Sequence, residues 1–168
     1  MMDAMLLTLR LVVGLLVAGH GAQKLFGWFG GHGIAGTAGW LESMRFRPAR
    51  LWAWLAGIAE FGGGVLFAAG LFSPLGSIGI ASSMLTAIVR AHWPKVWATD
   101  HGFELPLTYL VVALTVGGTG PGAYSLDTAL RTGLSGSLTA VMVIVALVGW
   151  IVGLTISAAR PAQPQSGT

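Results

Sequence analysis

Long apolar stretches alternate with short polar segments along the whole chain. Five of the stretches have helical character, at residues 4–26, 51–72, 76–92, 103–118 and 137–157. A helix needs about 20 apolar residues to cross a bilayer, and the stretch 103–118, about 24 Å long as a helix, is short for a span. The pattern predicts an all-α fold, a polytopic bundle of five transmembrane helices.

The segment between the first two stretches carries a weaker helical signal. Ile34, Ala38, Leu41 and Met44 recur at helical spacing, with Trp40 beside them. This amphipathic pattern predicts a short helix that lies in the membrane interface.

The connections follow from turn-forming residues. The sequence SPLG at residues 73–76 predicts a tight turn, and the Gly-, Ser- and Thr-rich residues 117–136 predict a long connection. We expect a disordered polar tail at 159–168.

Composition supports a membrane protein and narrows the chemistry. Hydrophobic residues make up 54% of the 168 residues and charged residues only 9%, against about 25% in soluble domains. The mean hydropathy is +0.76. A water-soluble chain of this composition would have to hide most of its surface in a large oligomer. Cysteine is absent from the sequence, which excludes thiolate nucleophiles and cysteine-ligated metal sites within the chain.

Basic residues predict the orientation in the membrane. With five spans, seven of the nine Lys and Arg residues fall on the side opposite the N-terminus, as do six of the seven tryptophans. By the positive-inside rule, the N-terminus is expected outside and the C-terminus in the cytoplasm. The basic residues are dispersed between apolar runs, which gives no nucleic-acid-binding patch.

Polar side chains of four predicted helices gather in the cytoplasmic half of the membrane. Ionisable groups in spanning segments are costly, and they usually face the bundle interior with a partner. We therefore expect a polar pocket with Glu60 as its deepest acid and Arg90 or His20 as the ion-pair partner of Glu60. Arg10 is expected to snorkel to the opposite surface. The pocket candidates are His20, Gln23, Lys24, Glu60, Arg90, His92 and Glu104.

The same polar residues allow other interpretations. They could serve only as structural contacts that lock the helices together, or they could line a proton or ion path. His20 and His92 could in principle ligate a haem, but their unequal depths disfavour this, and no metal site is predicted. No catalytic residue can be named from the sequence.

Three sequence blocks resemble the DoxX family of bacterial membrane proteins. They are GHGAQKLFGWFGGHGIAGTAGWLES, AGIAEFGGGVLFAAGLFSPLG and GPGAYSLD, within residues 6–131. The resemblance implies a DoxX-like four-helix core over residues 1–131 and a location in the bacterial inner membrane. The helix at 137–157, within residues 132–158, is an additional transmembrane helix outside that core. Beyond the pocket candidates His20, Gln23, Lys24 and Glu60, the matched motif positions are Gly21, Gly27, Pro74, Gly120, Pro121, Gly122, Ser125 and Asp127.

The resemblance implies a link to quinone-dependent redox systems. One hypothesis is a quinone-linked redox subunit or accessory protein, in which His20, Gln23, Lys24 and Arg90 donate hydrogen bonds and Glu60 relays a proton. The alternative is a non-catalytic scaffold or assembly factor for a redox or stress-response complex, and a small-molecule transporter is the third choice. The expected partners are the lipid bilayer, a redox protein and a second copy of the chain. Whether the protein is itself an enzyme stays open.

Overall fold

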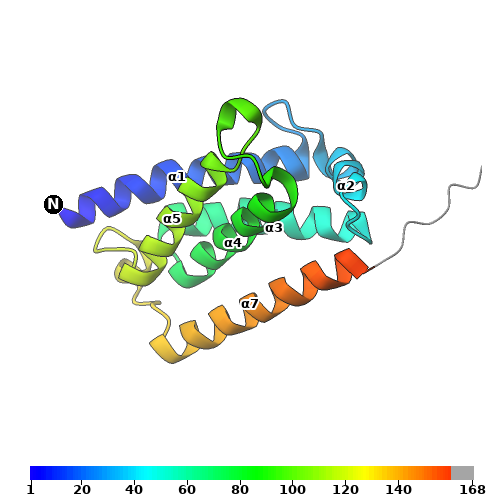
Figure 1. Ribbon diagram of the computed structural model, residues 1–168. Coiled ribbons are helices and arrows are strands. Elements are labelled where there is room, and N and C mark those ends of the chain that lie inside the picture. Colours follow the sequence, from blue (N-terminus) through cyan, green and yellow to red (C-terminus); the bar gives the residue numbers. More distant parts are fainter. Residues whose placement is uncertain (160–168) are drawn as a thin grey trace, which may run out of the picture.

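The computed structural model describes residues 1–159, with side chains through residue 155, and this part of the chain contains helices and no strands. The predicted all-α bundle is confirmed (Figure 1). The long helices are α1 (Met2–Phe26), α3 (Ala49–Ala69), α4 (Ser73–Thr86), α5 (Glu104–Thr119) and α7 (Gly136–Ala159). Short helices in the connections are α2 (Gly33–Ser43), a 3-10 turn at Ala98–Asp100 and α6 (Leu126–Leu130). The predicted tail lies, from residue 160 on, outside the described residues.

Four of the helices are long and apolar enough to cross a membrane. They are Met2–Phe26, Ala49–Ala69, Ser73–His92 and Gly136–Thr155. Helix α5 is also apolar but has only 16 residues. The long helices alternate in direction, so the start of α1 and the end of α7 lie at opposite ends of the bundle (Figure 1).

Helix α4 departs from the sequence prediction at both of its ends. Ser73–Gly76 is not a tight turn, because Pro74 occupies the first turn of α4, where its missing N–H costs no hydrogen bond. The chain reverses just before, at Gly70 and Phe72, which both have positive φ. At its other end α4 continues as a widened π-helical turn, Ala87–His92.

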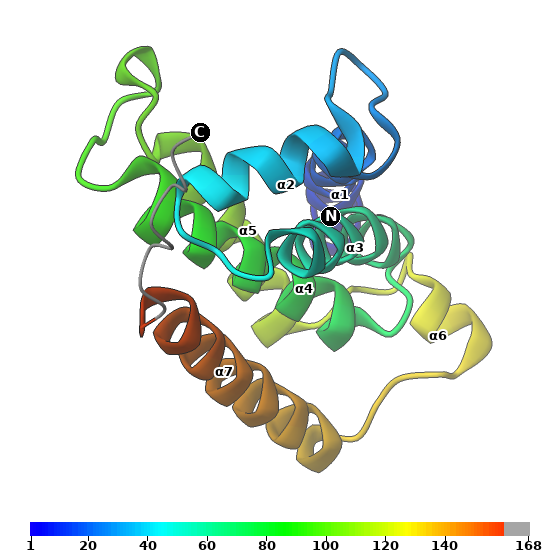
Figure 2. The same cartoon turned by 90° about the vertical axis from the view of Figure 1, so that its right-hand side faces the viewer.

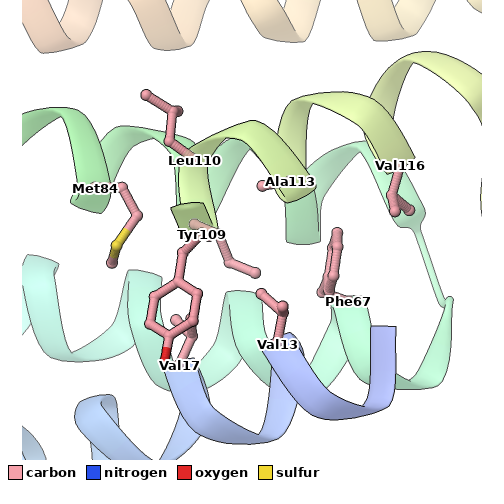
Figure 3. Close-up of a cluster of buried hydrophobic side chains, with 9 residues drawn as sticks. Val13, Val17, Phe67, Met84, Tyr109, Leu110, Ala113 and Val116 are labelled. Atoms are coloured by element: carbon pink, nitrogen blue, oxygen red, sulfur yellow. The ribbon is translucent and has the colours of Figure 1, made fainter. Parts of the chain in front are cut away.

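The bundle has its buried centre where α1, α3, α4 and α5 meet. Figure 3 shows side chains of these four helices converging, among them Val17, Phe67, Met84 and Tyr109. Phe67 and Val17 are almost completely buried. This cluster fixes the relative positions of the helices that carry the polar residues.

Helices α2 and α7 lie outside this centre. Figure 2 looks along α1 and α3 and shows α2 lying across their ends, while α7 flanks the bundle on the side of α4. Most side chains of α7 are exposed, as expected for a helix that faces lipid. Its Gly153 packs against the ring of Trp52, so this glycine serves contact with the bundle.

Glycines allow α1 and α3 to cross in close backbone contact. A Cβ atom added at Gly64 would lie 2.5 Å from the backbone nitrogen of Ala18 and 2.6 Å from the carbonyl oxygen of Gly14. A Cβ atom at Gly14 would meet Gly64 and Ala68 in the same way. Small residues at such crossings let helices in lipid gain van der Waals contact.

The substitution Gly64→Ala is expected to lower the free energy of unfolding by about 1–3 kcal/mol, because the new methyl group pushes α1 away from α3. Gly62→Ala is the matched control, since a Cβ atom there meets nothing within 4 Å. That control should raise stability by about 0.5–1 kcal/mol through helix propensity. SDS titration in mixed micelles measures both. Equal stability of the two variants would contradict the close crossing.

Candidate functional site

A buried ion pair joins α1 to α3. Lys24 lies in the last turn of α1, just before Gly27, whose left-handed conformation ends the helix. Its ammonium group donates to Oε1 of Glu60, which lies in the middle of α3. The Glu60 side chain is only 3% exposed and that of Lys24 is 28% exposed. The sequence prediction that Glu60 pairs with Arg90 or His20 is therefore wrong, because Lys24 is its partner.

The carboxylate of Glu60 keeps one acceptor free. Its second oxygen, Oε2, is buried and has no hydrogen-bond partner among the described residues. Buried polar atoms are nearly always paired, and an unpaired carboxylate oxygen is expensive. The ion pair thus engages only one of the two oxygens of this carboxylate.

The ion pair opens onto a cavity of about 250 Å³ between α2, α3, α7 and the end of α4. We call this the ion-pair cavity. Its charged lining residues are Lys24, Glu60 and Arg90, and the rest of its wall is mostly apolar. Three tryptophans contribute to that wall, namely Trp40 of α2, Trp52 of α3 and Trp150 of α7. The cavity combines one charged end with broad aromatic surfaces.

Arg90 reaches the ion-pair cavity from the π-helical turn after α4. Its guanidinium carbon lies 4.9 Å from the centre of the Phe46 ring, at cation–π distance. Phe46 is almost completely buried and stacks edge-on with Trp52. These contacts hold the Arg90 side chain against the wall of the cavity.

His20 and Gln23, which the sequence analysis placed in the pocket, do not line the ion-pair cavity. His20 is exposed, and its Nδ1 lies 3.1 Å from Oε1 of Gln23. The amide of Gln23 donates to the carbonyl oxygen of Phe29 at 3.1 Å. The two residues therefore anchor the loop that follows α1.

His92 and Glu104 also lie outside the ion-pair cavity. Nδ1 of His92 lies 2.6 Å from the carbonyl oxygen of His101, and Glu104 accepts a hydrogen bond from the backbone N–H of Ala98 at 2.9 Å. Both contacts fix the polar loop between the π-helical turn and α5. Of the seven pocket candidates, the cavity brings together Lys24, Glu60 and Arg90.

Sequence reasoning missed the contribution of α7 to the cavity. The indole N–H of Trp150 donates to Oγ1 of Thr86 at 2.8 Å, which ties α7 to α4 beside the cavity. A tryptophan inside an apolar run carries no signal of this role, because lipid and protein interior are equally apolar. Thr37 of α2 lines the cavity as well, and the sequence analysis did not predict it.

A second polar cluster lies at the other end of the bundle, around α6. The carboxylate of Asp127 accepts hydrogen bonds from the backbone N–H groups of Phe72 (2.8 Å) and Ser73 (2.9 Å). It also accepts from the hydroxyls of Ser73 (2.7 Å) and Thr132 (3.1 Å). Burial alone would raise the pKa of Asp127, but these hydrogen bonds outweigh burial and hold its pKa below the ordinary value.

Arg10 belongs to this Asp127 cluster. Its side chain is completely buried, donates to the carbonyl oxygen of Tyr124 and interacts electrostatically with Asp127. The expectation that Arg10 snorkels to the surface is wrong, because the loop around α6 encloses it.

Four motif positions, Gly120, Pro121, Gly122 and Ser125, build the loop that carries Asp127. Gly120 and Gly122 have positive φ on either side of Pro121, and the hydroxyl of Ser125 caps α6. Gly21, by contrast, lies against Phe61 at the crossing of α1 and α3. The polar side chains of the Asp127 cluster bond to one another and to backbone groups, whereas the ion-pair cavity leaves Oε2 of Glu60 without a partner among the described residues.

Comparison with known proteins gives one match. A family model described as DoxX matches residues 5–93, which is more than half of the chain. The matched range runs from α1 to the end of the π-helical turn and includes Lys24, Glu60 and Arg90. No curated protein and no solved structure gives a significant match.

Proposed function

The chain belongs to the DoxX family of membrane proteins, and from this premise we propose that it binds the headgroup of a lipid-soluble quinone in the ion-pair cavity. In this proposal the protein is a quinone-linked redox subunit or accessory protein. The observation that carries the proposal is the Lys24–Glu60 pair, whose half-satisfied carboxylate lines a mostly apolar, tryptophan-rich cavity.

The pair matches both redox forms of a quinone. An ammonium group such as that of Lys24 donates hydrogen bonds to a quinone carbonyl. A carboxylate such as that of Glu60 accepts a hydrogen bond from a quinol hydroxyl, and it can take up the proton when the quinol is oxidised. The aromatic rings of Trp40 and Trp52 offer flat surfaces against which a quinone ring can stack.

The size of the cavity suits one substituted ring. A dry apolar cavity of about 150 Å³ is enough to bind benzene in another protein, and the ion-pair cavity measures about 250 Å³. The chain has no cysteine. Electrons would therefore pass between the quinone and a partner redox protein, with this chain supplying binding and proton transfer.

The proposal includes an orientation in a bacterial inner membrane. With α5 counted as a span, the end that carries α2 faces the cytoplasm, because Lys24, Arg45, Arg47 and Arg50 gather there. The N-terminus then lies outside and the C-terminus inside. The ion-pair cavity would sit in the cytoplasmic half of the bilayer.

Quinone binding can be measured by quenching of tryptophan fluorescence in nanodiscs, since three of the seven tryptophans line the cavity. We expect Glu60→Gln to weaken binding of a short-tailed ubiquinone about tenfold, the usual effect of removing one charged hydrogen bond. Gly149→Leu should weaken it similarly, because Gly149 lines the cavity with open space beside it, and leucine would fill that space.

Gly19→Leu is the matched control for the filling variant. Gly19 also has nothing within 4 Å of an added Cβ atom, but it lies on α1 away from the cavity. This variant should bind like the unmodified protein. If the unmodified protein binds no quinone and purifies in mild detergent with a stable partner protein, the scaffold alternative is correct and the quinone proposal is wrong.

A further inference from the structure

A second cavity lies along α7, on the side away from the ion pair. It has a volume of about 310 Å³ and is formed by α4, α5 and α7. None of its lining residues is charged, and its polar side chains are the hydroxyls of Ser77, Ser82 and Thr139 and the indole of Trp150. We call it the apolar cavity. Its chemistry does not suit a charged or strongly polar headgroup.

The apolar cavity and the ion-pair cavity are neighbours along the contact between α4 and α7. Ser82, Ala146 and Trp150 line both of them. Along α4 the apolar cavity begins at Pro74, and the ion-pair cavity extends to Arg90 and Ala91 near the other end. The two cavities are therefore adjacent along the helix axes, and Trp150, which bonds to Thr86, lies in the wall that they share.

We propose that the apolar cavity holds the isoprenoid tail of the molecule whose headgroup occupies the ion-pair cavity. This inference rests on the proposed function and narrows its ligand to long-tailed quinones. In this proposal the headgroup lies at the Lys24–Glu60 pair. The tail runs past Trp150 towards the end of α4 that carries Pro74.

Binding of the tail would be favoured by van der Waals packing against the cavity wall and not by the free energy of transfer out of water. Lipid chains are as apolar as the cavity wall, so moving an isoprenoid chain from bilayer to protein removes no further surface from water. The preference must come from shape, because close contact between atoms is lost wherever a cavity stays empty. If the apolar cavity stayed empty, its wall would lose such contacts. A branched isoprenoid chain that fills the cavity can restore them.

The test compares two quinones and three matched glycine variants in nanodiscs. The quinones are a ubiquinone with a single isoprene unit and one with a long isoprenoid tail. Gly118 lines the apolar cavity, and a Cβ atom there meets nothing within 4 Å, so Gly118→Leu fills this cavity without a clash. Gly149→Leu fills the ion-pair cavity, and Gly19→Leu fills neither.

Gly118→Leu is expected to weaken binding of the long-tailed quinone about tenfold and to leave binding of the single-isoprene quinone unchanged. Gly149→Leu should weaken binding of both quinones, and Gly19→Leu should weaken binding of neither. If Gly118→Leu binds both quinones like the unmodified protein, or weakens both equally, the tail inference is wrong while the headgroup site stands. If the unmodified protein binds neither quinone, the proposed function fails and the tail inference falls with it.

A second measurement needs no variant. A long-tailed quinone with a photoreactive diazirine near the end of its tail is added to the unmodified protein in nanodiscs. Crosslinks within residues 74–85, 113–118 or 139–147 are expected, because these segments contribute to the wall of the apolar cavity. Crosslinks confined to lipid or to α1 would overturn the inference.

Discussion

Replacing Asp127 by alanine is expected to lower the free energy of unfolding by about 3–5 kcal/mol, because it leaves several buried hydrogen-bond donors without an acceptor, each at a cost of about 1–3 kcal/mol. The carboxylate accepts four hydrogen bonds, from Phe72, Ser73 and Thr132. It also lies close enough to the fully buried Arg10 for electrostatic attraction. Alanine removes all of these interactions and leaves the guanidinium group enclosed without a counter-charge.

The loss would be a large part of the total stability, which is about 5–15 kcal/mol in most proteins. SDS titration in mixed micelles measures it. Asp100→Ala is the matched control, because Asp100 is exposed, and it should change stability by less than about 0.5 kcal/mol. An Asp127→Ala protein that unfolds at the same SDS concentration as the unmodified protein would contradict the structural role of the cluster.

The same carboxylate predicts a dependence on pH. Because the pKa of Asp127 is lower in the folded protein than its ordinary value, the stabilisation is complete above about pH 4. It is then lost as the pH falls through the lowered pKa. The unmodified protein should therefore lose stability in acid, and Asp127→Asn should lose less over the same pH range.

The second large effect is expected at the buried ion pair. Lys24→Met leaves the carboxylate of Glu60 buried without a partner, and we expect a loss of about 2–3 kcal/mol. This is less than the about 3–5 kcal/mol for a fully buried pair, because the Lys24 side chain keeps 28% exposure to solvent. The double variant Lys24→Met/Glu60→Leu should recover most of this loss, since neither charge then remains buried.

An exposed pair provides the comparison. Arg47 and Glu42 lie 3.5 Å apart with side chains that are 34% and 57% exposed, so Arg47→Met should cost less than about 1 kcal/mol. If Lys24→Met costs no more than Arg47→Met, the Lys24–Glu60 pair is not a buried interaction. Quinone binding by Lys24→Met/Glu60→Leu then distinguishes a role of the pair in stability from a role in ligand binding. If the double variant regains stability but binds no quinone, the pair serves to bind the ligand.

The lengths and order of the helices followed from the sequence because apolar runs near the membrane thickness permit little else. The short helix α2 was also predictable, since its apolar residues recur at helical spacing. Proline was harder to interpret. Pro74 suggested a turn, but the first turn of a helix tolerates proline equally well, and the reversal occurs at Gly70 and Phe72.

The partners of the buried charges were not predictable for a physical reason. In water the apolar face of a helix marks the side that turns inward, but in lipid both sides are apolar and the rotation of a helix leaves little trace in the pattern. His20 and Lys24 lie one turn apart on α1, yet only the longer side chain reaches Glu60. Arg10 meets a loop more than a hundred residues away along the chain, a contact that no local pattern encodes.

The shortness of α5 has a consequence for the surrounding bilayer. Its 16 residues rise about 24 Å, whereas the hydrocarbon layer is about 30 Å thick. A span shorter than the hydrocarbon layer is accommodated by local thinning of the bilayer, at a cost of a fraction of a kcal/mol for each ångström. With α5 counted as a span, we expect lipids with shorter acyl chains to relieve that cost around the helix that carries Gly118.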